Sequence, residues 1–257
     1  MYPLHFRTMD KVHSIEHSLF EEWTKWLQKN KPEHGFTYDG VLCRESWIDA
    51  KKHILFLLKD VNNVSDSFNL RYYILNGVCN PDNWRTWDNV ARWAYGLMQT
   101  EQGYYPDFSE ADKWGFANNR VDALRQVAVV DIKKKPGKNH CTKKMLEDYF
   151  HQYPESYTFI AKQISLYGKL DYIVCCGDGV YEILLDIIKQ ENTILSNYFG
   201  RDLKYIARDN TLCAYRIAKS GTIIIDYRHP LLLEKGVNKR NVYLRLMNIA
   251  QDALANI

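Results

Sequence analysis

The sequence lacks any uninterrupted apolar run long enough to cross a bilayer, so we expect no membrane-spanning segment. Its first residues, MYPLHFRTMDK, also lack the charged and then apolar layout of a signal peptide, which favours an intracellular, cytoplasmic protein. No internal repeat, low-complexity tract or hinge-like linker divides the 257 residues. We therefore expect residues 1–257 to form one domain.

Several common sites are also absent from the sequence. The six cysteines include no C-x-x-C pair, and their spacing does not suit a zinc or iron–sulfur site. There is no G-x-x-x-x-G-K-[ST] motif and no complete G-x-G-x-x-G motif, so a nucleotide cofactor is not expected. We accordingly expect no metal and no cofactor, and reduced cysteines that lie mostly in the core.

Aromatic residues are abundant, at 14% of the chain, and include 18 Tyr and 7 Trp. Hydrophobic residues at 46% and charged residues at 25% are ordinary values for a globular protein. The net charge of +3 permits a nucleic-acid partner without requiring one. Most of the rings should lie in the core, but so many rings also offer surfaces on which a base could stack.

Short apolar runs alternate with amphipathic segments along the chain. Residues 1–50 are predicted to be an N-terminal helical extension, with a helix from Asp10 to Asn30 followed by a loop through GFTYDGVLCRESW. Further helices are predicted at TWDNVARWAYGLM, NNRVDALRQ, YTFIAKQISLYG, VYEILLDIIKQ and from about Asn238 onward, and strands at Ile54 to Leu58, Val127 to Ile132, DYIVCC, LCAYRIA and TIIIDY. This order predicts a three-layer α/β/α fold with a central, mainly parallel sheet.

Polar residues follow three of the predicted strands at their carboxyl ends. The first strand ends in KDVNN, the second in Asp131 and the basic loop KKKPGK, and the last in DYRHPLLL. Taken singly, each of these is better explained as a turn residue. Because the carboxyl ends of parallel strands meet at one edge of a sheet, Asp60, Asp131 and His229 are together expected to share a cleft.

The order of these pieces, from about Ile54 to the C-terminus, resembles the uracil-DNA glycosylase superfamily. LKDVNN stands where that family has a motif such as G-Q-D-P-Y-H or G-M-N-P-G, and VVDIKKKPG stands where a strand ends in a base-reading Asn. YIVCCGDGVYEILL matches the next strand and turn, and RHPLLL matches the H-P-S motif. The first motif here lacks the Gly and Pro, Asp131 replaces Asn and Leu231 replaces Ser. The four-cysteine cluster of the iron–sulfur branch is absent.

The resemblance implies a monomeric DNA glycosylase that hydrolyses the N-glycosidic bond of a flipped damaged or modified base. Asp60 would stabilise the cationic sugar and orient water, and His229 would donate to the departing base. The base would contact Asp131, Phe68 as a stacking ring, Asn62 and Asn63. The candidate DNA contacts are Lys133, Lys134, Lys135, Lys138, Arg228 and Lys235 at phosphates and Leu232 as an apolar wedge. A solvated charge run and a core-packed Phe68 are the alternatives.

Asp131 is the most informative departure from the family pattern. An ionised carboxylate only accepts hydrogen bonds, which predicts a base with an exocyclic amino group unless burial keeps Asp131 protonated. An ion pair with Lys133 or Arg228 outside the site is equally compatible with the sequence. Two other functions remain open: a module that binds a modified base or nucleic acid without cutting it, and a hydrolase of free nucleosides or nucleotides.

Overall fold

The computed structural model describes residues 4–30, 35–61, 66–76, 85–137, 140–190, 194–200, 203–208, 213–231 and 238–257. A seven-stranded sheet lies at its centre in the order β2 (Gly40–Val41), β5 (Ala128–Asp131), β3 (Ile54–Leu58), β6 (Tyr172–Cys176), β9 (Ile223–Tyr227), β8 (Cys213–Ile217) and β7 (Lys204–Arg208). The inner strands β5, β3, β6 and β9 are parallel, whereas β2, β8 and β7 run antiparallel to their neighbours. The short strands β1 (Thr37–Tyr38) and β4 (Phe68–Asn69) pair separately and in parallel.

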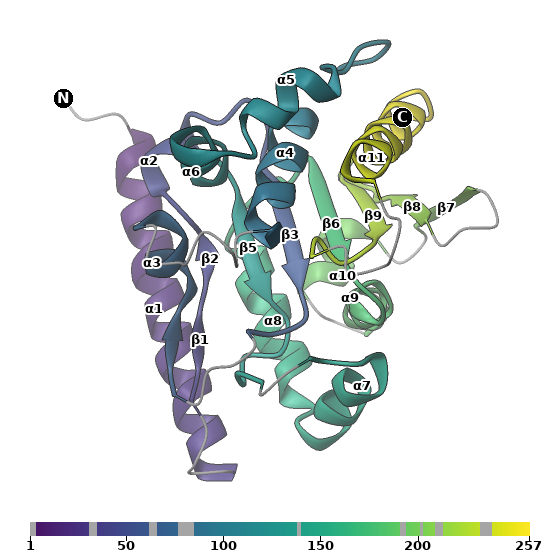
Figure 1. Ribbon diagram of the computed structural model, residues 1–257. Coiled ribbons are helices and arrows are strands. Elements are labelled where there is room, and N and C mark those ends of the chain that lie inside the picture. The colour runs from purple at the N-terminus through teal and green to yellow at the C-terminus, as the bar shows by residue number, and fades with distance from the viewer. Residues whose placement is uncertain are drawn as a thin grey trace.

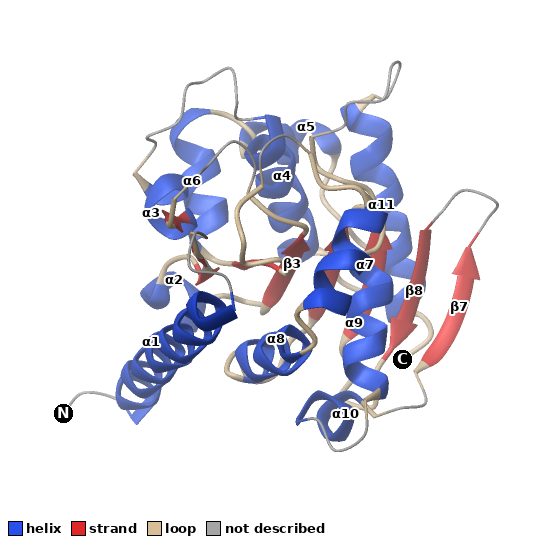
Figure 2. Cartoon of the chain, turned by 90° about the horizontal axis from the view of Figure 1, so that it is seen from below, coloured by secondary structure: helices blue, strands red, loops and turns tan. Residues whose placement is uncertain are grey.

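Helices cover both faces of the sheet (Figures 1 and 2). One face is covered by α1 (Leu4–Asn30), α7 (Lys143–Gln152), α8 (Glu155–Ser165), α9 (Val180–Lys189) and α10 (Ile194–Phe199). The other face is covered by α3 (Leu70–Leu75), α4 (Arg85–Gln99), α5 (Phe108–Lys113), α6 (Ala117–Arg125) and α11 (Lys239–Leu254), and the short α2 (Arg44–Ile48) follows β2. The predicted α/β/α fold with a mainly parallel sheet is confirmed.

The apolar runs explain the inner strands. Every residue of β3 and β6 is buried, because helices exclude water from both faces of these strands. Alternate residues enter the two core layers: Leu55 and Leu57 lie among the side chains under α1, α8 and α9, and Phe56 and Leu58 lie among those under α4 and α11.

The N-terminal segment is packed into this architecture. Leu19, Phe20, Trp23 and Leu27 of α1 are buried, and the Trp23 ring stacks on Phe159 of α8 with 5.0 Å between ring centroids. The segment predicted as a loop instead forms β1, β2 and α2, and β2 joins the sheet by pairing with β5. Residues 37–48 are therefore structural neighbours of the strand that ends at Asp131.

Two further expectations concern membranes and cysteines. None of the helices within the described ranges combines the length and apolarity needed to cross a bilayer. Cys43, Cys141, Cys175 and Cys176 are free thiols, and all of them except Cys43 are buried. The expectation that most of the cysteines are buried is confirmed for these four residues.

Candidate active site

The candidate site lies at the carboxyl edge of the four parallel strands. Asp131 ends β5, Asp60 follows β3 by two residues and His229 follows β9 by two. In the sheet, β3 lies beside β5, and β6 lies between β3 and β9. Leu58 is in register with Asp131, and both belong to the face covered by α4. The sequence therefore brings these three residues to one edge of the sheet.

The loops after β3 and β5 stay paired beyond the strands. The Lys133 backbone N–H donates to the Lys59 carbonyl at 2.9 Å, and the Gly137 N–H donates to the Val61 carbonyl at 2.6 Å. This pairing places Lys133 beside Asp60, and its Nζ donates to Asp60 Oδ2. The two side chains are only 9% and 2% exposed. The ammonium of Lys133, predicted to contact phosphate, thus faces a buried carboxylate instead of solvent.

Asp60 combines a charged partner with an unsatisfied oxygen. Its Oδ1 is buried and has no hydrogen-bond partner among the described residues. Burial raises the pKa of Asp60, and the Lys133 ammonium opposes this effect by favouring the ionised form. Asp60 therefore has one oxygen that the Lys133 ammonium stabilises and a second oxygen that accepts no hydrogen bond within the described ranges.

Asp131 is held more deeply than Asp60. It is 1% exposed, its backbone N–H donates to Asp39 Oδ2 at 2.8 Å, and its Oδ2 lacks a partner among the described residues. Burial, and then the negative charge of Asp39, raise the pKa of Asp131 well above its ordinary value. This environment favours the protonated form of Asp131, in which the carboxylic acid has one O–H donor and one carbonyl acceptor. Lys133, one of the two expected ion-pair partners of Asp131, pairs with Asp60 instead.

His229 is a neutral hydrogen-bond donor. The Leu231 backbone N–H donates to its Nδ1 at 3.1 Å, so the ring proton belongs on Nε2. Burial, reinforced by the charge of Lys59, lowers the pKa of His229 to about 4. At neutral pH the imidazole can therefore donate from Nε2 without carrying a charge.

Gly177 allows the His229 loop to approach the end of β3. This glycine follows β6 and has a φ of +99°, and a Cβ there would lie 3.2 Å from Lys59 Cε and 3.4 Å from His229 Cβ. A larger residue would push the two side chains apart and strain the backbone. Lys59 is itself tethered, because its Nζ donates to the Cys141 carbonyl at 3.1 Å.

Helix α4 supports the loop that carries His229. Asn89 is 3% exposed, and its Nδ2 donates to the Pro230 carbonyl at 2.7 Å. Arg92 Nη1 donates to Asn89 Oδ1 at 3.0 Å, and Arg92 Nε donates to Asp112 at 2.6 Å. This chain of buried hydrogen bonds fixes the orientation of Asn89 and, through it, the loop.

The remaining predicted site residues are less closely tied to this edge. Phe68 is half-buried, packs against the core under α4 and contacts the Tyr73 ring edge to face, with 5.1 Å between centroids. This arrangement corresponds to the core-packing alternative. Lys135 and Arg228 are half-buried. Five predicted residues lie outside the described part of the chain: Asn62, Asn63, Lys138, Leu232 and Lys235.

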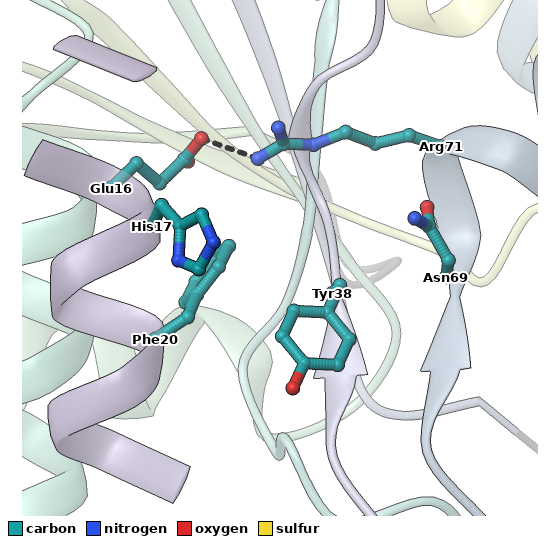
Figure 3. Close-up of a pocket in the computed structure, with 6 residues that line it drawn as sticks. All are labelled: Glu16, His17, Phe20, Tyr38, Asn69 and Arg71. Atoms are coloured by element: carbon teal, nitrogen blue, oxygen red, sulfur yellow. Dashed lines mark hydrogen bonds and ion pairs between the residues drawn. The ribbon is translucent and has the colours of Figure 1, made fainter. Parts of the chain in front are cut away.

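A cavity of about 370 Å³ lies between α1 and the β1–β4 pair. Its lining consists of Glu16, His17, Phe20, Tyr38, Asn69 and Arg71, none of which the sequence predicts as a site residue. Figure 3 shows Arg71 reaching across the cavity from α3 to form an ion pair with Glu16 of α1.

Sequence reasoning missed four residues that build the strand-end site: Asp39, Lys59, Asn89 and Gly177. It also predicted Lys134 as a phosphate contact, which is wrong, because Lys134 is buried and donates to Asp39. A signal existed for Lys134, because neighbouring residues of an extended segment point to opposite sides, so KKK cannot present all three ammonium groups in one direction. For Asp39 and Asn89 the sequence offers no such signal.

The strand-end residues thus combine an ion-paired carboxylate, a second carboxyl group whose burial favours its protonated form, and a neutral imidazole. Environments that push the pKa values of neighbouring groups apart are typical of acid–base sites. No family model and no curated protein matches this sequence, so the chemistry of these side chains carries the functional interpretation.

Proposed function

We propose that the protein is a DNA glycosylase-like hydrolase that cleaves the N-glycosidic bond of a flipped base, with Asp60 and His229 as its catalytic residues. One observation carries this proposal: a carboxylate paired with Lys133 and a neutral imidazole follow parallel strands at the same edge of the sheet. The sequence resemblance supports the same chemistry on the same residues.

The two catalytic groups match the charges that develop during the reaction. As the bond between the sugar C1′ and the base nitrogen breaks, its electron pair leaves with the base and C1′ becomes cationic. Asp60 stabilises this cation and orients the attacking water. The water oxygen forms a bond to C1′ and the water releases a proton, while the departing base takes up a proton. His229 donates from Nε2 to an oxygen of the base and stabilises its negative charge.

A protonated Asp131 changes the expected base. Its O–H and C=O groups offer one donor and one acceptor, as an Asn amide does. This donor and acceptor complement a base edge that has a carbonyl oxygen beside a ring N–H. The preference for an amino-bearing base, predicted from the sequence, applies to an ionised Asp131. We therefore expect oxo-bearing bases such as uracil, hypoxanthine or xanthine to be preferred over cytosine.

The test uses oligonucleotides that carry each of these bases at one position. Incubation followed by alkali should break the strand at an oxo-bearing base and leave the cytosine control intact. Asp60→Asn should lower turnover by about 100-fold or more while binding changes little, because the charge matters mainly when the sugar becomes cationic. Asp49→Asn, at an exposed position, is the matched control. No strand breaks with any base would reject the glycosylase proposal.

A module that binds bases without cutting them is the second candidate. One observation favours it: Lys133 already occupies Oδ2 of Asp60, and burial of Asp60 disfavours its ionised form. Tight binding of a base-containing oligonucleotide without strand breaks would support this function. Hydrolysis of free nucleosides or nucleotides in a parallel assay would instead support a small-molecule hydrolase.

A further inference from the structure

Beneath Asp131 lies a buried polar network centred on Asp39, which connects β1 and β2. Asp39 is 0% exposed and accepts three hydrogen bonds of 2.6–2.9 Å. The donors are the backbone N–H of Asp131, Nζ of Lys134 and Nε2 of Gln163. Lys134 and Gln163 are likewise 0% exposed. Segments that are distant in the sequence thus converge on one carboxylate next to the proposed base-reading residue.

A second set of hydrogen bonds fixes the residues around Asp39. Gln163 Nε2 also lies 2.9 Å from the Tyr167 hydroxyl, which donates to Glu16 Oε1 at 2.8 Å. Arg71 binds both Glu16 and the backbone carbonyl of Asp39, and Figure 3 shows its side chain extended towards Glu16. The Asp39 carboxylate is therefore restrained on both sides and has little freedom to reorient.

We infer that Asp39 is a positioning residue for Asp131: it holds the Asp131 backbone through the N–H and places a buried negative charge next to the residue that reads the base. This inference rests on the proposed function. The charged and titratable groups that act on Asp131 are Asp39, Lys134, Asp60 and Lys133. Of these, Asp39 has the largest effect after burial, and it favours the protonated acid.

Stability alone is a weak explanation for this network. Replacement of a buried ion pair by apolar residues of similar volume is often neutral or stabilising, so Asp39 and Lys134 are not needed simply to fill space. The bond from the Asp131 N–H to a side-chain oxygen also lies just beyond the point where β2 stops pairing with β5, at Gly40 and Val129. A carboxylate at that point sets the position of the last strand residue, whose side chain would touch the base.

The first experiment titrates the side-chain carboxyl of Asp131 by carbon NMR, with its resonance identified by its loss in Asp131→Asn. Asp39→Asn should lower the pKa of Asp131, because a negative neighbour is removed and Lys134 remains. Lys134→Met should raise the pKa, because a positive neighbour is removed and Asp39 remains. If either single variant fails to fold, the other one decides, because each is expected to shift the pKa of Asp131 from the wild-type value in its own direction. Identical titrations in the folded variants would overturn the inference.

The second experiment separates the hydrogen bond from the charge. In the Lys134→Met background, the amide introduced by Asp39→Asn can still accept from the Asp131 N–H, whereas the methyl group left by Asp39→Ala cannot. Base release should therefore fall by about 10- to 100-fold more in Asp39→Ala/Lys134→Met than in Asp39→Asn/Lys134→Met, as expected for a misplaced contact group. Equal rates in the two double variants would exclude the positioning role of the hydrogen bond.

The control is Lys143→Met/Glu182→Gln, which removes an exposed ion pair of 2.8 Å elsewhere on the molecule. This control should leave both the Asp131 titration and the rate unchanged. Absence of base release from the wild type would reject the proposed function, whereas the titration would still decide whether Asp39 governs the protonation of Asp131.

Discussion

Replacement of Lys133 by Met gives the sharpest test of the strand-end site. The sequence predicts that Lys133 binds phosphate, whereas the structure pairs it with Asp60, so the two interpretations differ in what the variant should lose. If the ammonium neutralises Asp60, Lys133→Met should destabilise the fold and leave the salt dependence of DNA binding unchanged. If it contacts phosphate, the salt dependence should flatten and the stability should stay the same.

The magnitude follows from the burial of the pair. With side chains 9% and 2% exposed, Lys133 and Asp60 are largely removed from water. Loss of one partner from such a pair typically costs about 3–5 kcal/mol, because the other charge remains buried without compensation. Asp60 can relieve part of this cost by taking up a proton, so we expect a loss near the lower limit, about 3 kcal/mol. With a urea m-value of about 3 kcal/mol/M, the unfolding midpoint should fall by about 1 M.

Urea unfolding of four proteins forms a double-mutant cycle for this pair. Asp60→Asn/Lys133→Met should recover most of the lost free energy and lie within about 1 kcal/mol of the wild type, because neither charge remains. Lys143→Met, which breaks an exposed pair, should cost under about 1 kcal/mol. If Lys133→Met unfolds at the same urea concentration as the wild type, and its DNA binding depends less on salt, the pairing of Lys133 with Asp60 is refuted.

Three further predictions concern single positions. Burial and the Glu182 carboxylate raise the pKa of Asp226 to about 7, so the folded state binds its proton more tightly than the unfolded state. The free energy of unfolding is then lost as the pH rises from the ordinary carboxyl pKa of 3.8 towards 7. Asp226→Asn should therefore raise the urea midpoint more at pH 8 than at pH 5. An equal rise of the midpoint at both pH values would contradict this reasoning. Asn89→Ala should lower the free energy of unfolding by about 1–3 kcal/mol, because the Pro230 carbonyl loses its buried donor. The same change should lower turnover more than DNA binding. Unchanged kinetics would rule out a role of Asn89 in supporting the His229 loop. Gly177→Ala should destabilise more than Gly168→Ala, since both have positive φ but a Cβ at Gly168 has no neighbour within 4 Å; equal losses would mean that contact with Lys59 and His229 is unimportant.

The fold was predictable where burial leaves a direct trace in the sequence. A strand covered on both faces is an apolar run, which is why β3, β6 and β9 were identified, and the long amphipathic helices α4 and α11 have the matching helical period. Helix α7 was missed although Thr142 accepts a hydrogen bond from the Met145 N–H as its N-cap, because the preceding basic loop obscured this signal. The edge strand β7 was missed because its pairing with β8 depends on tertiary context.

The candidate site was predictable only in part. The positions of Asp60, Asp131 and His229 follow from strand ends and parallel topology. Their electrostatic environments do not, because the contact between Lys133 and Asp60 depends on loop pairing beyond β3 and β5. The alternating directions of an extended chain send Lys134 to Asp39 instead, and only the packed structure reveals that Asp39 lies there.

The network beneath Asp131 also has a consequence for synthesis of the chain. Glu16 of α1 and Gln163 of α8, whose side chains meet in this network, are 147 residues apart. At about 5–20 residues per second, the ribosome makes Glu16 roughly 7–30 s before Gln163. During that interval the buried rings of α1, among them Phe20 and Trp23, have no α8 to cover them. The nascent chain is therefore expected to depend on chaperones until α8 emerges, and the strand-end site can form only after β9 and His229 have followed it.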